Sequence, residues 1–320
     1  MTNQLLLQTV ALATAATLVF SPATGTAALA DPQIRVEVSL VNLYATVRDK
    51  NRRIIGKLEK NDFKVFEDGK EQQVEFFRAE THQPISLGIL MDTSGSMHSI
   101  FGAEQDAASA FLRRVLTPKD LAMVMTFDMD VDLMADFTSD PDRLERAIRR
   151  ARVHAAGGII TPGTVPSQSG GTNFYDAVWL ACKEKLSSET GRKALVVLTD
   201  AEDTGSRVKL KEALETAHRT DTVIHVLYIS VRGGFGFGGG AYGVAKQMAE
   251  ETGGRVIEIR NDRDLERAFD QISEELRAQY TLGYYPSNPA RDGAFRKIKV
   301  ELKDQDLKVL TRKGYFAPRG

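Results

Sequence analysis

Between Pro84 and Ala278, continuous apolar runs alternate with stretches of helical periodicity, and this alternation constrains the fold of the chain more than any other feature. The apolar runs cover residues 85–91, 121–127, 194–199 and 223–229, and a further short strand is expected at 255–259. Such uninterrupted runs indicate strands that are buried on both faces. The helical stretches cover residues 103–116, 141–153, 175–186, 209–219, 241–252 and 264–278. The order predicts an α/β fold with a doubly wound, mainly parallel sheet, whose functional edge lies at the carboxyl ends of the strands.

The flanks of this region have the composition of strands. Before it, residues 34–47 alternate apolar and polar side chains, and residues 63–66 and 74–77 lie on either side of an Asp68-Gly69 turn. After it, residues 280–285, 295–302 and 307–311 are also strand-like. Neither flank has enough strands for a stable sheet, so we expect them to pair in a small β-sandwich into which the α/β domain is inserted. The predicted parts are residues 1–30, a signal peptide; 31–82, the first sandwich strands; 83–280, the α/β domain; and 281–320, the last sandwich strands.

The first thirty residues carry no charged side chain, and Ala28-Leu29-Ala30 places small residues before Asp31. This pattern predicts a secretory signal peptide, and therefore an exported protein that is periplasmic, cell-surface or secreted. The alternative is an uncleaved anchor, the one case in which we expect contact with a membrane. A single cysteine, Cys182, cannot form an internal disulfide, and its helical surroundings predict a buried apolar role.

Charge and histidine spacing argue against several function classes. The chain has 42 Lys and Arg against 43 Asp and Glu, and this balance does not favour nucleic-acid binding. The five histidines lack the spacing of a zinc site, and His225, in an apolar run, is expected to be a core residue with satisfied hydrogen bonds. Ser94 and Ser96 lack the sequence setting of a nucleophile. We therefore expect no enzyme.

Oxygen-bearing side chains follow two of the predicted buried strands and one loop. Asp92, Ser94 and Ser96 alternate on a turn directly after the first apolar run. Thr172 ends a loop rich in Gly and Pro, and Asp200 closes the run at 194–199. Because parallel strands end at one sheet edge, these side chains can converge there on a hard cation, which takes oxygen ligands.

In this order, the motifs D-T-S-G-S-M, G-T and L-T-D resemble the metal-ion-dependent adhesion site (MIDAS) of von Willebrand factor A (VWA) domains, as found in integrins and many bacterial surface proteins. The resemblance covers about residues 83–280 and implies a Rossmann-like sheet. The flanking segments at 61–69 and 279–286 resemble the VWFA-related proteins of Acidobacteria. Ala201 departs from the family pattern, which usually has Gly after the last Asp. We expect a negative φ there and only a small adjustment of the loop.

The resemblance implies that Asp92, Ser94, Ser96, Thr172 and Asp200 surround one Mg²⁺ (or Mn²⁺ or Ca²⁺), with one coordination position open for a Glu or Asp carboxylate of a protein partner. The function expected from the sequence is therefore metal-dependent protein binding of the adhesion type. The alternative is a structural or assembly component of the cell envelope, in which the metal only stabilises the fold. Asp128, Asp130 and Asp132 are expected to lie in a solvated loop, with part of a Ca²⁺ loop as the other interpretation.

Overall fold

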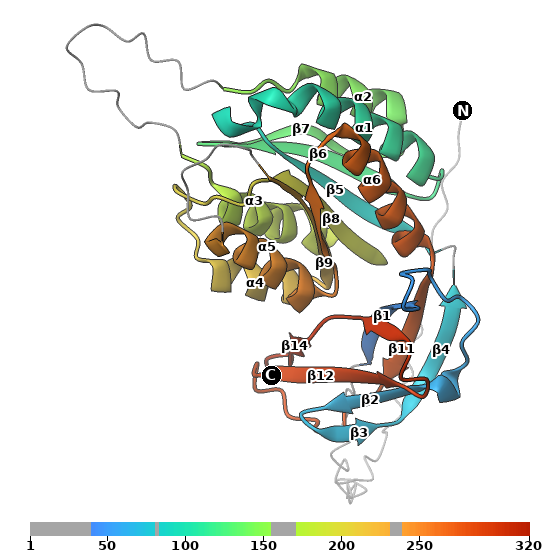
Figure 1. Ribbon diagram of the computed structural model, residues 1–320. Helices are drawn as coiled ribbons and strands as arrows, with labels where there is room; N and C mark the ends of the chain where they lie inside the picture. The colour runs from blue at the N-terminus through green and yellow to red at the C-terminus, as the bar shows by residue number, and fades with distance from the viewer. Residues whose placement is uncertain (1–39, 81–82, 155–170, 231–238) are drawn as a thin grey trace, which may run out of the picture. The chain divides into compact units, whose positions relative to one another are not determined.

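A computed structural model of the protein describes residues 40–80, 83–154, 171–230 and 239–320 (Figure 1). Its largest sheet has six strands in the order β10-β9-β8-β5-β6-β7. The bounds are β5 Ile85–Asp92, β6 Leu121–Phe127, β7 Val131–Thr138, β8 Arg192–Thr199, β9 Thr222–Ile229 and β10 Val256–Ile259. Every residue of β5 is buried, because β5 lies in the middle of the sheet and has a parallel neighbour on each side. The uninterrupted apolar composition of this strand follows from that position.

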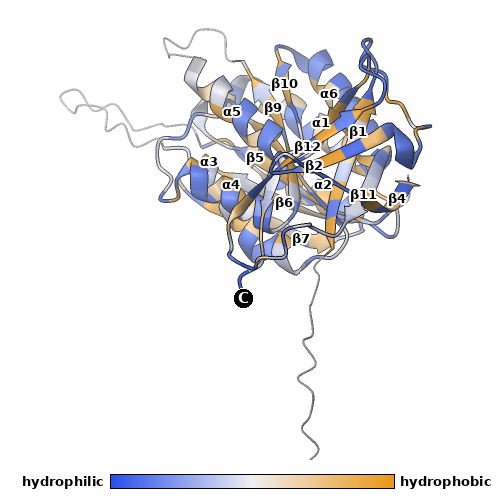
Figure 2. Cartoon of the chain, turned by 90° about the horizontal axis from the view of Figure 1, so that it is seen from below, coloured by the Kyte–Doolittle hydropathy of each residue, from blue (hydrophilic) through white to orange (hydrophobic). Residues whose placement is uncertain are grey.

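Helices cover both faces of this sheet (Figure 1). Helices α1 Phe101–Val115, α2 Pro141–Arg150 and α6 Asp262–Arg277 pack on one face, and α3 Phe174–Leu180, α4 Leu210–Arg219 and α5 Gly239–Thr252 pack on the other. The two faces therefore hold separate hydrophobic cores. Figure 2 shows the corresponding pattern, with hydrophobic residues on the inner strands and hydrophilic residues on the outer sides of the helices. Cys182 is buried in the second core, as predicted.

Strand β7 is the one strand of this sheet that is not predicted from the sequence. It pairs with β6 in antiparallel fashion through an irregular register, and most of its side chains are half-buried or exposed. Because it lies at the edge of the sheet and packs on one side, it lacks the apolar run that marks the other strands. Helix α2 begins as predicted, with the Asp140 carboxylate accepting from the Asp142 N–H and Pro141 at its first position, but it ends three residues before Val153.

The flanking strands form two further antiparallel sheets, in the orders β13-β1-β11-β4 and β14-β12-β2-β3. Their bounds are β1 Val41–Arg48, β2 Phe63–Glu67, β3 Lys70–Gln72, β4 Val74–Glu80, β11 Gln279–Tyr284, β12 Phe295–Leu302, β13 Lys308–Leu310 and β14 Gly314–Phe316. Strands from both ends of the chain pair in each sheet, and both sheets contribute to one hydrophobic cluster. The predicted fold class is therefore confirmed: a mixed α/β fold with a central, mostly parallel sheet flanked by helices, and additional antiparallel sheets.

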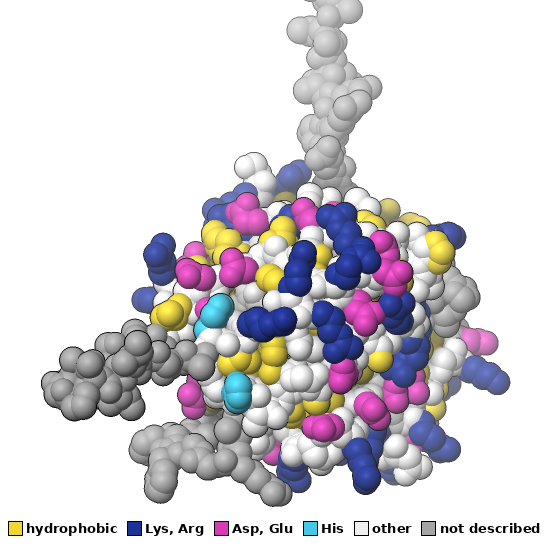
Figure 3. Space-filling model, turned by 90° about the horizontal axis from the view of Figure 1, so that it is seen from above, with side chains coloured by type: hydrophobic (Ala, Val, Ile, Leu, Met, Phe, Trp, Pro, Cys, Tyr) yellow, Lys and Arg dark blue, Asp and Glu magenta, His cyan; other side chains and the backbone are white. Residues whose placement is uncertain are grey.

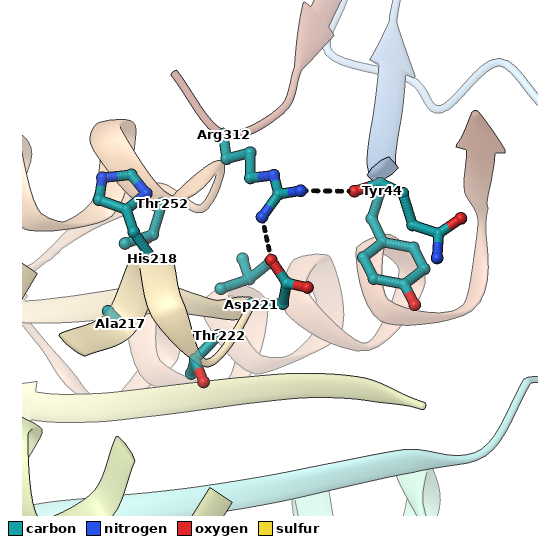
Figure 4. A pocket seen from close by; sticks show the side chains of 9 residues that line it. Tyr44, Ala217, His218, Asp221, Thr222, Thr252 and Arg312 are labelled. Carbon is teal, nitrogen blue, oxygen red and sulfur yellow. Dashed lines mark hydrogen bonds and ion pairs between the residues drawn. The ribbon is translucent and has the colours of Figure 1, made fainter. Parts of the chain in front are cut away.

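Charged side chains join the sandwich strands to the α/β layers within one compact unit. Arg48 of β1 and Arg255 both pair with the buried Glu275 of α6. On another side, Arg312 pairs with Asp221 and donates to the Asn42 carbonyl beside a small cavity (Figure 4). His225 lies 3.7 Å from Glu275 but has no hydrogen-bond partner among the described residues, so the prediction of satisfied hydrogen bonds was wrong. Burial and the nearby Arg255 lower the pKa of His225 to about 3, and the ring stays neutral.

The predicted signal peptide at residues 1–30 lies outside the described residues, as does most of the Gly- and Pro-rich loop before Thr172. Within the described ranges, no helix is long and apolar enough to cross a bilayer. The face drawn in Figure 3 mixes Lys and Arg with Asp and Glu side chains, in keeping with the near-balanced charge of the chain.

Candidate metal centre

Strand order places two of the predicted site residues beside each other. Strand β5 comes first in the chain, and the chain then continues to β6 on one side and later to β8 on the other. The carboxyl ends of β5 and β8 therefore border the point where the strand order reverses, which is where open α/β sheets bind ligands. Asp92 is the last residue of β5, and Asp200 directly follows β8. Their charges act on each other, because the Asp200 carboxylate contributes to raising the pKa of Asp92.

The end of β5 and the turn after it carry one buried carboxylate and two neighbouring hydroxyls. Asp92 is fully buried, and its Oδ1 accepts from the Ser94 N–H at 2.9 Å. The chain then enters a 3₁₀ turn at Gly95–Ser99, anchored by the buried side chain of Met97. The Oγ atoms of Ser94 and Ser96 lie 3.0 Å apart, with Ser96 exposed to solvent. Two oxygens at that separation can bind the same cation.

Thr172 and Asp200 lie on loops that are bonded to each other. The Thr172 carbonyl accepts from the Thr204 and Gly205 N–H groups at 3.0 and 3.2 Å, and the Thr172 N–H donates to the Thr204 hydroxyl. Both Thr172 and Asp200 are buried, and the Asp200 carboxylate accepts from the Glu202 N–H. Thr204 and Gly205, which the sequence analysis did not single out, thus link the loop of the second motif to the loop that follows the third.

Asp128 joins the first motif to the second, and the prediction that it lies in a solvated loop was wrong. It is 8% exposed, accepts from the Thr93 hydroxyl at 2.9 Å, and pairs with His154. Its carbonyl accepts from the Asn173 N–H at 2.7 Å. The hydrogen bond from His154, together with those from Asp130 and Thr93, holds the pKa of Asp128 below its usual value despite partial burial. Asp130, by contrast, is exposed.

Thr199 and Ala201 orient Asp92 from the neighbouring strand. The Thr199 hydroxyl accepts from the Ala201 N–H at 2.9 Å and donates to Asp92 Oδ2 at 2.7 Å. Because the hydroxyl is an acceptor toward Ala201, its proton is directed at the carboxylate. Ala201 has φ 57°, so the expectation of a negative φ was wrong. A left-handed conformation costs a residue with a Cβ about 1–2 kcal/mol, and here it directs the Ala201 N–H back toward Thr199.

In the described part of the chain, the acidic side chains of this centre have no cationic partner. Burial and the charge of Asp200, acting against the hydrogen bonds from Ser94 and Thr199, raise the pKa of Asp92 to about 7. Burial, with Asp92 and Asp200, also raises the pKa of Glu104, a residue of α1, well above its ordinary value. Among the residues that the structure describes, no Lys, Arg or His forms an ion pair with Asp92, Glu104 or Asp200.

The donor chemistry fits a hard divalent cation. Within the described ranges, no three acidic, histidine or cysteine side chains gather closely enough to bind one ion between them. The predicted set does not need three, because it consists of the carboxylates of Asp92 and Asp200 and the hydroxyls of Ser94, Ser96 and Thr172. Mg²⁺ commonly takes one or two carboxylates and keeps several waters. A dication would also compensate the buried carboxylates, which have no cationic partner in the described part of the chain.

Comparison with known proteins identifies the fold of the α/β part. Residues 87–202 match the family model of the von Willebrand factor type A domain. Proximal thread matrix protein 1 from the mussel byssus has a similar structure, with a TM-score of 0.51 at 13% sequence identity over 66% of this chain and 51% of that one. The α/β part of this chain has the VWA fold.

Two further solved structures resemble the chain. A von Willebrand factor type A protein from Catenulispora acidiphila aligns over 82% of this chain and 75% of its own, at 14% identity and a TM-score of 0.49. The vWF domain of the type V pili tip protein Mfa5 from Porphyromonas gingivalis aligns over 60% and 94%, at 12% identity and a TM-score of 0.46. No curated protein matches the chain in sequence. VWA domains often mediate protein–protein interactions.

Proposed function

We propose that this chain is an exported protein-binding module whose VWA domain holds one divalent cation, Mg²⁺ or its substitutes Mn²⁺ and Ca²⁺, and uses it to bind a Glu or Asp carboxylate of a partner protein. The observation that carries the proposal is the turn after β5, in which Asp92 is fully buried and the hydroxyls of Ser94 and Ser96 lie 3.0 Å apart. A buried carboxylate without a cationic partner is costly, and a cation at this point would compensate it.

In this proposal the ion lies at the crevice between β5 and β8, held by Ser94, Ser96 and Thr172 with Asp92 and Asp200, some directly and some through water. Because Ser96 is exposed, the ion would have a side that faces solvent. Hard cations accept a further carboxylate oxygen there in exchange for water. Ser94 and Ser96 lack the sequence setting of a nucleophile, so we propose that the module is not an enzyme.

A calorimetric titration with Mn²⁺ tests the metal site. The wild-type chain is expected to bind one equivalent, and Asp92→Asn is expected to bind at least a hundredfold more weakly, because it removes one of the two carboxylates. Asp130→Asn is the matched control, since Asp130 is an exposed aspartate on the neighbouring turn. Equal binding by wild type and Asp92→Asn would refute the site.

The open coordination position has a separate test. Bound Mn²⁺ accelerates the relaxation of water protons when it carries exchangeable water. Acetate is a minimal carboxylate probe, and we expect it to lower this relaxation enhancement by displacing one water. An enhancement that saturating acetate leaves unchanged would contradict the proposed mode of partner binding, even if the metal itself is bound.

The second candidate is a structural or assembly role in the cell envelope, with the metal stabilising the fold. The buried carboxylates of Asp92 and Glu104 favour it, because their repulsion in the metal-free protein would be relieved on binding. Affinity capture from the native envelope, with Mg²⁺ and with EDTA, separates the two candidates. The adhesion-type proposal predicts a partner that is retained with Mg²⁺ and lost both with EDTA and in Asp92→Asn. The structural proposal predicts that a folded Asp92→Asn protein retains the same partner.

Export rests on the sequence of residues 1–30, which predicts a signal peptide and a periplasmic, cell-surface or secreted protein. Mass spectrometry of the N-terminus of the native protein tests it, with cleavage after Ala30 as the expected result. The narrower resemblance to the Acidobacterial VWFA-related proteins and the expected absence of nucleic-acid binding stay predictions.

A further inference from the structure

Helix α1 carries a carboxylate on its buried, apolar side. Glu104 is fully buried, in line with Phe101, Ala108 and Phe111 at the helical spacing of three and four residues. Neither of its carboxylate oxygens has a hydrogen-bond partner among the described residues. Glutamate is seldom fully buried without a partner, because desolvation of the carboxylate is costly. An apolar side chain would satisfy the packing of this helix face.

The surroundings of Glu104 point to the metal centre. Two charges act on its carboxylate, those of Asp92 and Asp200, so the buried Glu104 lies near both. Glu104 lies in the first turn of α1, and this helix begins directly after the turn at Gly95–Ser99 that carries the Ser96 hydroxyl. The helix dipole also favours an acidic residue there, but that contributes at most about 1–2 kcal/mol, whereas burying an ion costs several.

We propose that Glu104 is a positioning residue of the metal centre, whose carboxylate accepts hydrogen bonds from water bound to the ion on its buried side. This inference rests on the proposed function. A direct bond to the ion is not part of it, because no three acidic side chains of the described chain lie close enough to share one ion. Carboxylates that hold metal-bound groups in this way commonly raise metal affinity 10- to 100-fold.

The extra carboxylate has two opposite effects. It strengthens retention of the cation, because it adds negative charge beside Asp92 and Asp200. It also weakens the attraction of the bound ion for a further carboxylate, because the partner's negative charge meets a centre that is already compensated. The role therefore predicts a variant that loses metal affinity and, once loaded with metal, binds acetate more tightly.

The experiment is a Mn²⁺ titration of the whole chain as wild type, Glu104→Gln and Glu67→Gln, followed by acetate titration at saturating Mn²⁺. Glu67 is the matched control: a buried carboxylate in the sandwich, where it accepts from the Tyr284 and Tyr315 hydroxyls. We expect Glu104→Gln to bind Mn²⁺ about 10- to 100-fold more weakly and acetate more tightly, while Glu67→Gln matches wild type in both.

Stability in EDTA separates this role from a structural one. The proposal predicts that Glu104→Gln unfolds at the same or a higher urea concentration than wild type in EDTA, because the variant loses only an unpartnered charge. Lower stability in EDTA together with unchanged Mn²⁺ affinity would overturn the proposal. Should the Gln variant not fold, Glu104→Met fits the apolar stripe, and Mn²⁺ affinity of that variant equal to wild type would overturn the proposal as well.

The two proposals fail in different ways. If wild type and Asp92→Asn bind Mn²⁺ equally, the metal centre itself is wrong. If Asp92→Asn loses binding and Glu104→Gln keeps the affinity of wild type, the metal centre stands and the role of Glu104 is refuted.

Discussion

The metal-free protein is expected to become more stable when Asp92 is replaced by Asn. Burial and the charge of Asp200 raise the pKa of Asp92 from 3.8 to about 7, against the hydrogen bonds from Ser94 and Thr199. A folded-state pKa above the unfolded value means that stability is fully present below pH 4 and is lost as pH rises through 7. About three pKa units, at about 1.4 kcal/mol each, amount to about 4 kcal/mol of lost stability at pH 8.

Asp92→Asn removes that titration. The Asn side-chain oxygen keeps one of the two hydrogen bonds that the carboxylate accepts. Loss of the other hydrogen bond lowers the stability of the variant by about 1 kcal/mol. We therefore expect the variant in EDTA at pH 8 to have a free energy of unfolding about 3 kcal/mol above wild type. Urea unfolding followed by fluorescence measures this difference, and at pH 4 the two proteins are expected to differ much less.

Magnesium is expected to cancel most of this difference and to leave the two proteins nearly equal in stability. At a Mg²⁺ concentration of about a hundred times its dissociation constant, the wild type gains about 2.7 kcal/mol, and Asp92→Asn gains almost nothing. Asp120→Asn is the control, because Asp120 is also buried but is paired with Arg277. It is expected to destabilise the protein with or without Mg²⁺. An Asp92→Asn protein that is clearly less stable than wild type in EDTA at pH 8 would refute the reasoning.

Three further predictions concern the stability of the fold. His218 packs edge-on against Phe295, and burial, with the nearby Arg312, lowers the pKa of His218 to about 4. The contribution of the neutral ring to stability is therefore present above pH 6.5 and is lost as pH falls toward 4. Urea unfolding should show that wild type loses about 3 kcal/mol relative to His218→Gln over that range, and an equal pH dependence of the two proteins would contradict this. Glu275→Gln leaves Arg48 and Arg255 without their carboxylate and should lower the free energy of unfolding by about 3 kcal/mol in the same assay. A decrease below about 1 kcal/mol would count against the pairing. Ala201→Val places a β-branched residue at φ 57° and should lower stability by about 2 kcal/mol or more, whereas a melting temperature equal to wild type would argue against the left-handed conformation.

Much of the fold could be predicted from the sequence because its strong signals are local. The uninterrupted run from Ile85 to Met91 identifies the central strand, and Asp140-Pro141 identifies the start of a helix. The partner strands of the sandwich follow from the small number of strands on each flank. Strand β7 has no such signal, because an edge strand with exposed side chains reads like a loop.

The predicted site residues follow from motif order, but the groups that support them depend on tertiary contacts. Asp128 is buried by Thr93, thirty-five positions away, and no local pattern shows this. The φ of Ala201 is likewise set by the loop after β8. Glu104 is different, because its spacing from Phe101 and Phe111 places it on the apolar stripe of α1, a signal present in the sequence.

The claim that five oxygen-bearing side chains share one cation is tested most directly by anomalous diffraction from crystals of the protein grown with Mn²⁺. We expect one strong anomalous peak at the crevice between β5 and β8, at about 2.0–2.2 Å from the Ser94 and Ser96 hydroxyl oxygens, with Asp92, Thr172 and Asp200 bound directly or through one water. A fully loaded crystal with no peak there, or with its only peak elsewhere on the molecule, would contradict it.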